Sequence, residues 1–269
     1  MTAERVWIDA RGGGFGHAMR GANLAALLAE EGHRVTLCVR PGSETFVESS
    51  PWFELRVHEG IPTDRGGTLV VDTFAEGARG EWNACALQRF SRRVLCARYR
   101  KDGLRAEGYD EVWLPYAAAH DEWQNGHVQN ARYLGLLARP APRIEPRGAW
   151  VVFDPGARLD PELHAVFTRL ARALGLSLEV VRALPRRAAK LLCIGAGYNT
   201  VYELLRQPLD VRFLPLSRRY DDQARRARLL DRATCDLEAL RAWLRAPCSP
   251  SALPDAWYAQ TLRAERGAA

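Results

Sequence analysis

The strongest constraint on the fold is a strand–loop–helix–strand unit at the start of the chain. A short run over residues 6–10, apolar except for Asp9, predicts a strand, and the glycine-rich loop 11–17 follows it. Apolar residues at helical spacing predict a helix over 18–31, and residues 35–39 predict a second strand. A unit of this kind is typical of the opening of an α/β fold.

The same alternation continues along the 269 residues and starts afresh near residue 149. In the first half we expect strands at 55–57, 68–72, 93–97 and 111–114, and helices at 43–50, 80–90 and 99–107. In the second half we expect strands at 149–153, 178–182, 191–194 and 211–216, and helices at 161–174, 199–206, 221–230, 236–244 and 254–265. Prolines at 140, 142 and 146 exclude regular structure between the halves. We therefore predict an N-terminal domain over 1–139, a linker over 140–148 and a C-terminal domain over 149–269.

Composition excludes several classes of protein. No apolar run approaches the roughly 18 residues that a membrane-spanning helix needs, and the first residues have no signal-peptide pattern. The six cysteines form no C-x-x-C pair, and no histidine stands at zinc spacing from them. We therefore expect a cytoplasmic protein with no metal site.

Charge is unevenly distributed along the chain. Residues 1–139 hold 17 Lys+Arg against 18 Asp+Glu, a net charge of −1, and residues 140–269 hold 21 against 14, a net charge of +7. The second half would attract an anion such as a nucleoside diphosphate, and a solvated arginine-rich surface explains the charge equally well. An anionic membrane surface is a possible peripheral partner. No recognisable nucleic-acid-binding motif accompanies the charge, so we expect no nucleic-acid partner.

The first candidate site is the N-terminal glycine loop. Gly13, Gly14 and Gly16 let the backbone approach a ligand, and the N-terminus of the following helix suits a phosphate or an oxyanion. His17 stands where the loop meets the helix, and a neutral imidazole there could act as a general base toward a hydroxyl or water. Arg20 lies one helical turn on and could bind phosphate or a carboxylate. The alternatives are a histidine that hydrogen-bonds the loop and a surface salt bridge.

A dinucleotide-binding loop is a weaker interpretation of the same segment. Counted from Gly12, the third glycine position of a G-x-G-x-x-G motif is His17. The second strand is followed by Arg40 and not by the acidic residue that binds a ribose, which leaves an NADP site as a minor alternative.

The second candidate site follows the apolar strand at 191–194. Gly195, Gly197 and Thr200 could contact a diphosphate at a helix N-terminus, and Glu203 could accept two ribose hydroxyls. The alternative is a capping box with Asn199 or Thr200 at the N-cap and Glu203 closing it. Further along, Asp222 and Gln223 could contact sugar hydroxyls, whereas the arginines beside them are most simply the solvated face of a helix.

These motifs together resemble a GT-B glycosyltransferase. The resemblance is to the family 28-like group that contains the peptidoglycan N-acetylglucosaminyltransferase and to related predicted bacterial glycosyltransferases. It rests on Gly16-His17-Ala18-Met19-Arg20, on Gly197-Tyr198-Asn199-Thr200-Val201-Tyr202-Glu203, and on Pro215 followed by Asp222-Gln223 and Arg226-Ala227. The segment from Val71-Asp72 to Glu81 resembles a block of the predicted group.

The resemblance implies two Rossmann-like domains that face each other across a cleft, in a compact variant of the GT-B fold. A nucleoside-diphosphate sugar, such as a UDP-sugar, would bind the C-terminal domain, with Glu203 on the ribose and Thr200 and the glycines on the diphosphate. Tyr198 and Asn199 lie in the same block, and Gln223 with Asp222 would hold the sugar. The N-terminal domain would hold an unknown acceptor, with His17 near the reacting centre and Asp72 and Glu81 in its acceptor-side block. The implied reaction is metal-independent hexosyl transfer with no cofactor.

Two alternatives remain open within this resemblance. The chain is shorter than is usual for the fold, and the short nucleotide-sugar hydrolase of pseudaminic acid synthesis shares its Gly-Phe-Gly-His…Arg loop and uses water as acceptor. Relatives carry a glycine-rich phosphate loop where this chain has Asp154-Pro155-Gly156-Ala157-Arg158. That difference is compatible with a non-catalytic homologue that binds nucleotide sugars or has lost its site.

Overall fold

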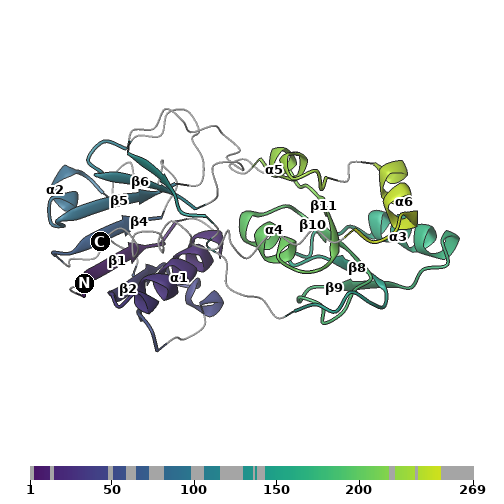
Figure 1. Ribbon diagram of the computed structural model, residues 1–269, viewed down its shortest axis with the longest axis horizontal. Coiled ribbons are helices and arrows are strands. Elements are labelled where there is room, and N and C mark those ends of the chain that lie inside the picture. Colours follow the sequence, from purple (N-terminus) through teal and green to yellow (C-terminus); the bar gives the residue numbers. More distant parts are fainter. Residues whose placement is uncertain are drawn as a thin grey trace. The chain divides into compact units, whose positions relative to one another are not determined.

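The structure is a computed structural model of the chain. The structure describes residues 3–12, 15–47, 51–58, 65–72, 82–97, 106–115, 130–135, 137, 143–217, 222–233 and 236–249. These residues form two compact units, one within 3–137 and one within 143–249, each shown in Figure 1. The expected helix at 254–265 and most of the one at 99–107 lie outside the described residues, as do Gly13, Gly14 and Glu81.

The first unit is built on a parallel sheet with strand order β3-β2-β1-β4-β5-β6-β7. Its strands are β1 (Arg5–Asp9), β2 (Arg34–Val39), β3 (Glu54–Val57), β4 (Thr68–Val71), β5 (Arg92–Cys96), β6 (Glu111–Leu114) and β7 (Ala131–Tyr133). The central strands are almost wholly buried, as parallel strands covered on both faces must be, which explains their continuous apolar runs. Six of the seven strands were predicted; the three-residue β7 was not.

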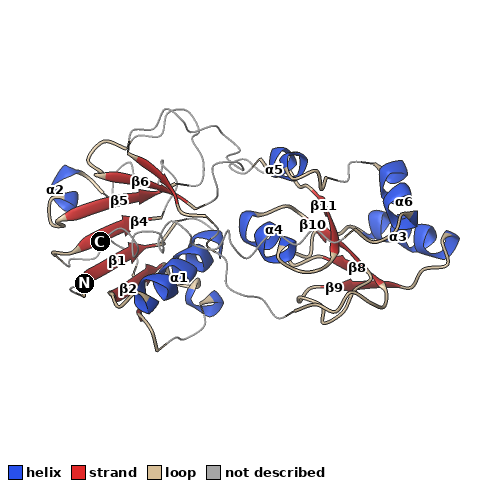
Figure 2. Cartoon of the chain, viewed as in Figure 1, coloured by secondary structure: helices blue, strands red, loops and turns tan. Residues whose placement is uncertain are grey.

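Helix α1 (Phe15–Glu30) packs against β1 and β2 (Figure 2). Gly21 allows this close approach, because a Cβ there would lie 2.6 Å from the Cβ of Ala10. The helix predicted at 43–50 is wrong in its described part: only a 3-10 turn, Glu44–Phe46, forms, and Val47 turns the backbone to an extended conformation. The helix predicted at 80–90 is reduced to α2 (Ala84–Leu87), which Asn83 caps through the backbone N–H of Ala86.

The second unit is built on a smaller parallel sheet with strand order β11-β10-β8-β9. Its strands are β8 (Trp150–Phe153), β9 (Leu178–Val181), β10 (Lys190–Ile194) and β11 (Asp210–Leu214), and its helices are α3 (Pro161–Ala173), α4 (Tyr198–Leu205), α5 (Gln223–Leu229) and α6 (Leu237–Arg245). Phe167, Leu170, Leu240 and Trp243 join α3 and α6 to the sheet in one core. All of these strands and helices were predicted.

Residues of the predicted linker are attached to the second unit. Ile144 is buried and its backbone N–H donates to the side chain of Gln207 at 2.9 Å. Glu145 forms a parallel bridge with Arg187. The exact domain bounds otherwise stay a prediction.

Each parallel sheet has a topological switch point, where the chain stops adding strands on one side of the first strand and continues on its other side. This point lies between β1 and β4 in the first unit and between β8 and β10 in the second. In open α/β sheets, ligands bind at the carboxyl ends of the strands at such points. The first turn of α1 and the residue after β4 meet at the first point, and the loops after β8 and β10 follow the two strands that flank the second. The topology therefore brings the candidate residues of each unit together.

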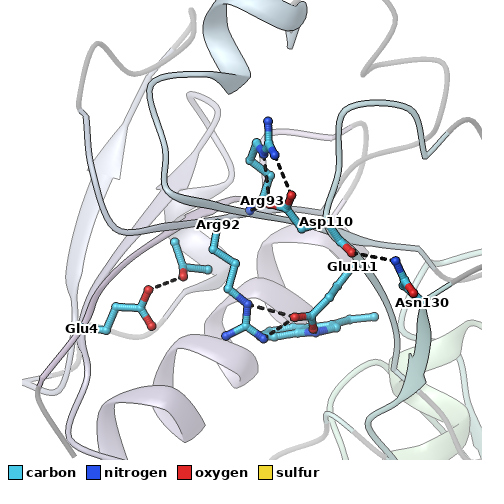
Figure 3. A network of polar contacts seen from close by, with 8 residues as sticks. Glu4, Arg92, Arg93, Asp110, Glu111 and Asn130 are labelled. Atoms are coloured by element: carbon cyan, nitrogen blue, oxygen red, sulfur yellow. Dashed lines mark hydrogen bonds and ion pairs between the residues drawn. The ribbon is translucent and has the colours of Figure 1, made fainter.

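The opposite, amino-terminal edge of the first sheet is tied by polar contacts (Figure 3). Arg92 pairs with Glu111 at 2.6 Å and Arg93 with Asp110 at 2.6 Å, so both pairs link β5 to β6 or to the residue before it. The Arg93 guanidinium holds the pKa of Asp110 below its usual value despite some burial. These pairs are partly exposed and lie away from the ligand-binding edge, so we assign them to the pairing of strands.

Candidate active site

His17 and Asp72 meet at the carboxyl edge of the first sheet. His17 lies in the first turn of α1, and Asp72 is the residue that follows β4. The Nδ1 atom of His17 lies 3.0 Å from Oδ1 of Asp72, and the two residues are only 7% and 1% exposed. A contact across 55 residues of sequence forms because β1 and β4 are neighbours in the sheet.

Arg20 completes this cluster. Its Nε donates to Oδ2 of Asp72 at 2.8 Å, and its Nη2 donates to Oδ1, so the guanidinium binds both carboxylate oxygens. The same Nη2 lies 3.1 Å from Nδ1 of His17. Arg20 is 3% exposed, so the expectation that it pairs with a carboxylate is met, and the alternative of a surface salt bridge is wrong. A phosphate contact stays a prediction.

The electrostatics of the cluster favour an ionised carboxylate. Burial alone would raise the pKa of Asp72, but the charge of Arg20 and the contact with His17 hold that pKa below its usual value. An ionised Asp72 accepts a hydrogen bond from Nδ1–H of His17, and we assign this tautomer. The Nε2 atom then carries a lone pair, which is the form of imidazole that can accept a proton.

Gly12 provides the space in which the His17 ring lies. A Cβ atom on Gly12 would lie 2.8 Å from Cγ and Cδ2 of the imidazole and 2.9 Å from Nδ1. Sequence analysis singled out Gly13, Gly14 and Gly16 but not this residue. Gly16 is exposed, and a Cβ there would meet no heavy atom within 4 Å. Only the tertiary position of the ring distinguishes the two described glycines.

A second carboxylate, Asp9, lies at the end of β1 and was not predicted. It accepts from Arg11 Nε at 2.8 Å and from the indole of Trp82 at 2.6 Å, and it is buried. Asp9 is therefore neutralised by Arg11 beside the His17–Asp72 pair. A signal was available in the sequence, since Asp9 is a charged residue within the otherwise apolar first predicted strand.

In the second unit, the N-terminus of α4 has no side-chain cap. The N-cap residue is Gly197, which makes no side-chain hydrogen bond, and Gly195 before it has a φ of +94°, a conformation that suits glycine. The capping-box alternative is therefore wrong, because neither Asn199 nor Thr200 is the N-cap. The first N–H groups of the helix retain the orientation that binds an anion.

Three polar side chains lie in this helix beside its open end. Burial raises the pKa of Glu203, and within the described part of the chain its carboxylate has no hydrogen bond or ion pair. The Oδ1 atom of Asn199 is buried without a described partner, and Thr200 is half-buried. Tyr198 packs edge-on against Tyr202 at 4.8 Å between ring centroids and is buried. Thr200 and Glu203 thus lie one turn apart on α4, as the motif predicted.

Gln223 and Asp222 have contacts inside the protein. The Oε1 atom of Gln223 accepts from the backbone N–H of Ala196 at 2.7 Å and of Leu216 at 3.0 Å, so one side chain joins the loops after β10 and β11. Asp222 caps α5 through the backbone N–H of Arg225 at 2.9 Å. Their predicted contact with a sugar stays a prediction.

The arginines of α5 are not all on a solvated face. Arg226 is 1% exposed and donates to the carbonyl oxygen of Ala196 at 2.6 Å, so it supports the loop after β10. The simple expectation of a solvated helix face is wrong for this residue. The resemblance had included Arg226 in its C-terminal block, without a role.

The loop after β8 is closed on itself. Buried Asp154 accepts from the backbone N–H of Arg158 at 2.9 Å and of Leu159 at 2.8 Å. These N–H groups stand where a glycine-rich loop would present donors to phosphate, so here a carboxylate occupies them. The open end of α4 is therefore the better anion site of the second unit.

No protein-family model matches the chain, and a search of curated proteins finds no match. Solved structures do match. The glycotransferase of kitacinnamycin is 13% identical, with 91% of this chain and 90% of that chain covered and a TM-score of 0.65. UGT89C1 of Arabidopsis thaliana, solved with UDP-L-rhamnose, is 12% identical, with 98% and 94% covered and a TM-score of 0.60. MurG of Acinetobacter baumannii is 14% identical, with 90% of each covered and a TM-score of 0.53.

These likenesses concern the fold. The chain has the α/β architecture of the GT-B glycosyltransferases, as the sequence motifs predicted. Within the described ranges, no group of three or more His, Cys, Asp or Glu side chains is arranged to hold a metal ion. No helix among the described residues is long and apolar enough to cross a membrane.

Proposed function

We propose that the protein is a glycosyltransferase that moves a hexosyl group from a nucleoside-diphosphate sugar to an acceptor hydroxyl, without a metal ion. The observation that carries the proposal is the buried His17–Asp72 pair at the carboxyl edge of the first sheet. An imidazole that donates Nδ1–H to a carboxylate keeps its lone pair on Nε2, and this form is suited to remove a proton from a hydroxyl. The fold supports the same class of reaction, since the three compared structures are glycosyltransferases.

In the proposed mechanism, Nε2 of His17 takes the proton of the acceptor hydroxyl as its oxygen attacks the anomeric carbon. The bond between that carbon and the phosphate oxygen breaks, and the nucleoside diphosphate leaves with the bonding electrons. Asp72 accepts a hydrogen bond from Nδ1–H of His17 and stabilises the imidazolium that forms. Asp72 itself stays ionised throughout.

The donor is assigned to the second unit. The diphosphate would lie at the open N-terminus of α4, near Gly195, Gly197 and Thr200, where N–H groups and the helix dipole neutralise the leaving charge. Glu203 would accept the ribose hydroxyls, because its carboxylate is half-buried and has no described partner. A UDP-sugar is a suitable first donor, because UGT89C1 was solved with UDP-L-rhamnose.

A panel of UDP-, GDP- and TDP-sugars tests the proposal, each with and without a mixture of hydroxyl acceptors. Transfer that needs an acceptor and is lost in His17→Ala supports the glycosyltransferase. Rapid, stoichiometric hydrolysis without acceptor assigns the protein to the nucleotide-sugar hydrolases of the same fold. Absence of any thermal stabilisation by nucleoside diphosphates would leave a protein without a functional donor site.

A further inference from the structure

We propose that Arg20 is a positioning residue that sets the pH range in which His17 serves as a base. The inference rests on the proposed function for its kinetic consequence but not for its geometry. Arg20 and His17 stand one turn apart on α1, and both contact Asp72 after β4. Arg20 is buried and contacts both Asp72 and His17, so in this proposal it acts through these two neighbours.

Arg20 fixes the geometry of the cluster. Because the guanidinium fork binds both oxygens of Asp72, it fixes the carboxylate in the plane that presents Oδ1 to Nδ1 of His17. A carboxylate held at both oxygens cannot rotate to offer the imidazole a different acceptor. The orientation of the His17 ring thus depends on Arg20, although no reacting atom needs to contact it.

Arg20 also affects the charge of the cluster. With a neutral imidazole, the buried cluster of Arg20, Asp72 and His17 has a net charge of zero; with an imidazolium, its net charge is +1. Removing Arg20 changes these charges to −1 and zero, so the protonated imidazole becomes the better compensated form. In this proposal, Arg20 therefore disfavours the protonated form of the imidazole relative to a cluster that lacks the guanidinium.

The other described groups near the cluster do not replace this charge. The thiol of Cys96, at the end of β5, lies beside Arg20 and Asp72, and burial raises its pKa, so it is uncharged at neutral pH. Asp9, at the end of the adjoining β1, is compensated by Arg11. Arg20 is thus the cation that balances Asp72.

The kinetic test compares pH profiles of kcat/KM for Arg20→Gln and Arg20→Lys with the parent protein. Loss of charge in Arg20→Gln is expected to move the acid limb to higher pH by about one unit or more. Lysine keeps the charge but not the fork, so Arg20→Lys is expected to keep the acid limb and lose rate at every pH. Arg93→Gln, which removes an arginine–aspartate pair at the other edge of the same sheet, is the matched control and is expected to keep the parent profile (Figure 3).

A second test needs no activity and so separates this inference from the proposed function. Long-range ¹⁵N NMR follows the imidazoles of all six histidines through a pH titration, and the His17 signals are those missing in His17→Ala. The titration of His17 is expected to move to higher pH in Arg20→Gln and to lower pH in Asp72→Asn, while Arg93→Gln leaves it in place. An unmoved His17 titration in Arg20→Gln that remains folded overturns the inference, as does an Arg20→Lys variant whose titration shifts as far as that of Arg20→Gln.

Discussion

Replacing Gly12 with alanine tests how closely the His17 ring is held. A Cβ on Gly12 would lie 2.8 Å from two carbon atoms of the imidazole. Unbonded carbon atoms meet at about 3.5 Å or more, so the ring and the loop must separate by about 0.7 Å. The Nδ1 atom of His17 now lies 3.0 Å from Asp72 Oδ1. A displacement of that size along the contact would lengthen it to about 3.7 Å, which is no longer a hydrogen bond.

We therefore expect Gly12→Ala to lower kcat by about tenfold to a hundredfold, since a misplacement near 1 Å can cost about 10² in rate. Donor affinity should not change, because the donor is assigned to the other unit. Overpacking is also expected to destabilise the protein by about 1–3 kcal/mol. Initial rates on the donor found in the panel, donor titrations and urea unfolding measure the three effects.

Gly16→Ala is the matched control for structure, because it adds the same methyl group four residues on, where no heavy atom lies within 4 Å. The imidazole NMR signals of Gly16→Ala should match those of the parent. Its free energy of unfolding should equal or exceed the parent's, since alanine favours a helix over glycine. A Gly12→Ala protein with the parent's kcat and unchanged His17 signals would refute the claim that Gly12 makes room for the ring.

Three further predictions follow from buried polar groups. Glu203→Gln should raise the melting temperature at pH 8 by about 2 °C or more while it weakens donor binding. Because the pKa of Glu203 is raised, the contribution of this one carboxyl to stability is fully present below pH 4.5 and is lost as the pH rises through the folded-state pKa. An unchanged melting temperature at pH 8 contradicts this. Gln223→Ala should lower the free energy of unfolding in urea by about 1–3 kcal/mol for each backbone N–H left unsatisfied, at Ala196 and Leu216. Gln223→Glu keeps the accepting oxygen and should cost less, so equal losses in the two variants would argue against the loop contact. Asp72→Asn should lower the free energy of unfolding by about 3–5 kcal/mol at pH 7, because it breaks a buried ion pair. Because the pKa of Asp72 is lowered, the contribution of its carboxylate to stability is present above pH 3.8 and is lost as the pH falls through the folded-state pKa. The stability difference between parent and Asp72→Asn should therefore shrink in acid, and a constant difference down to unfolding would refute it.

Local patterns were sufficient for most of the secondary structure. The buried strands of both sheets appear in the sequence as apolar runs. Helices α3, α5 and α6 are each preceded by an aspartate that caps the helix with its side chain: Asp160, Asp222 and Asp236. Failures occurred where packing decides. The segment at 43–50 has too few apolar residues at helical spacing to hold a helix on the sheet, and β7 is too short to give a periodic signal.

The sequence by itself determined the order of strands and helices, the two glycine-bounded loops and the identity of His17 and Glu203 as candidates, because these depend on neighbours within a few residues. Only the tertiary structure decided that Asp72 joins Arg20 and His17, because the contact depends on β4 pairing beside β1 after two other strands have intervened. The same holds for Gly12, which matters for the ring above it, and for Gln223, which joins two loops. Contacts of this kind are properties of strand order in space, and no local pattern records them.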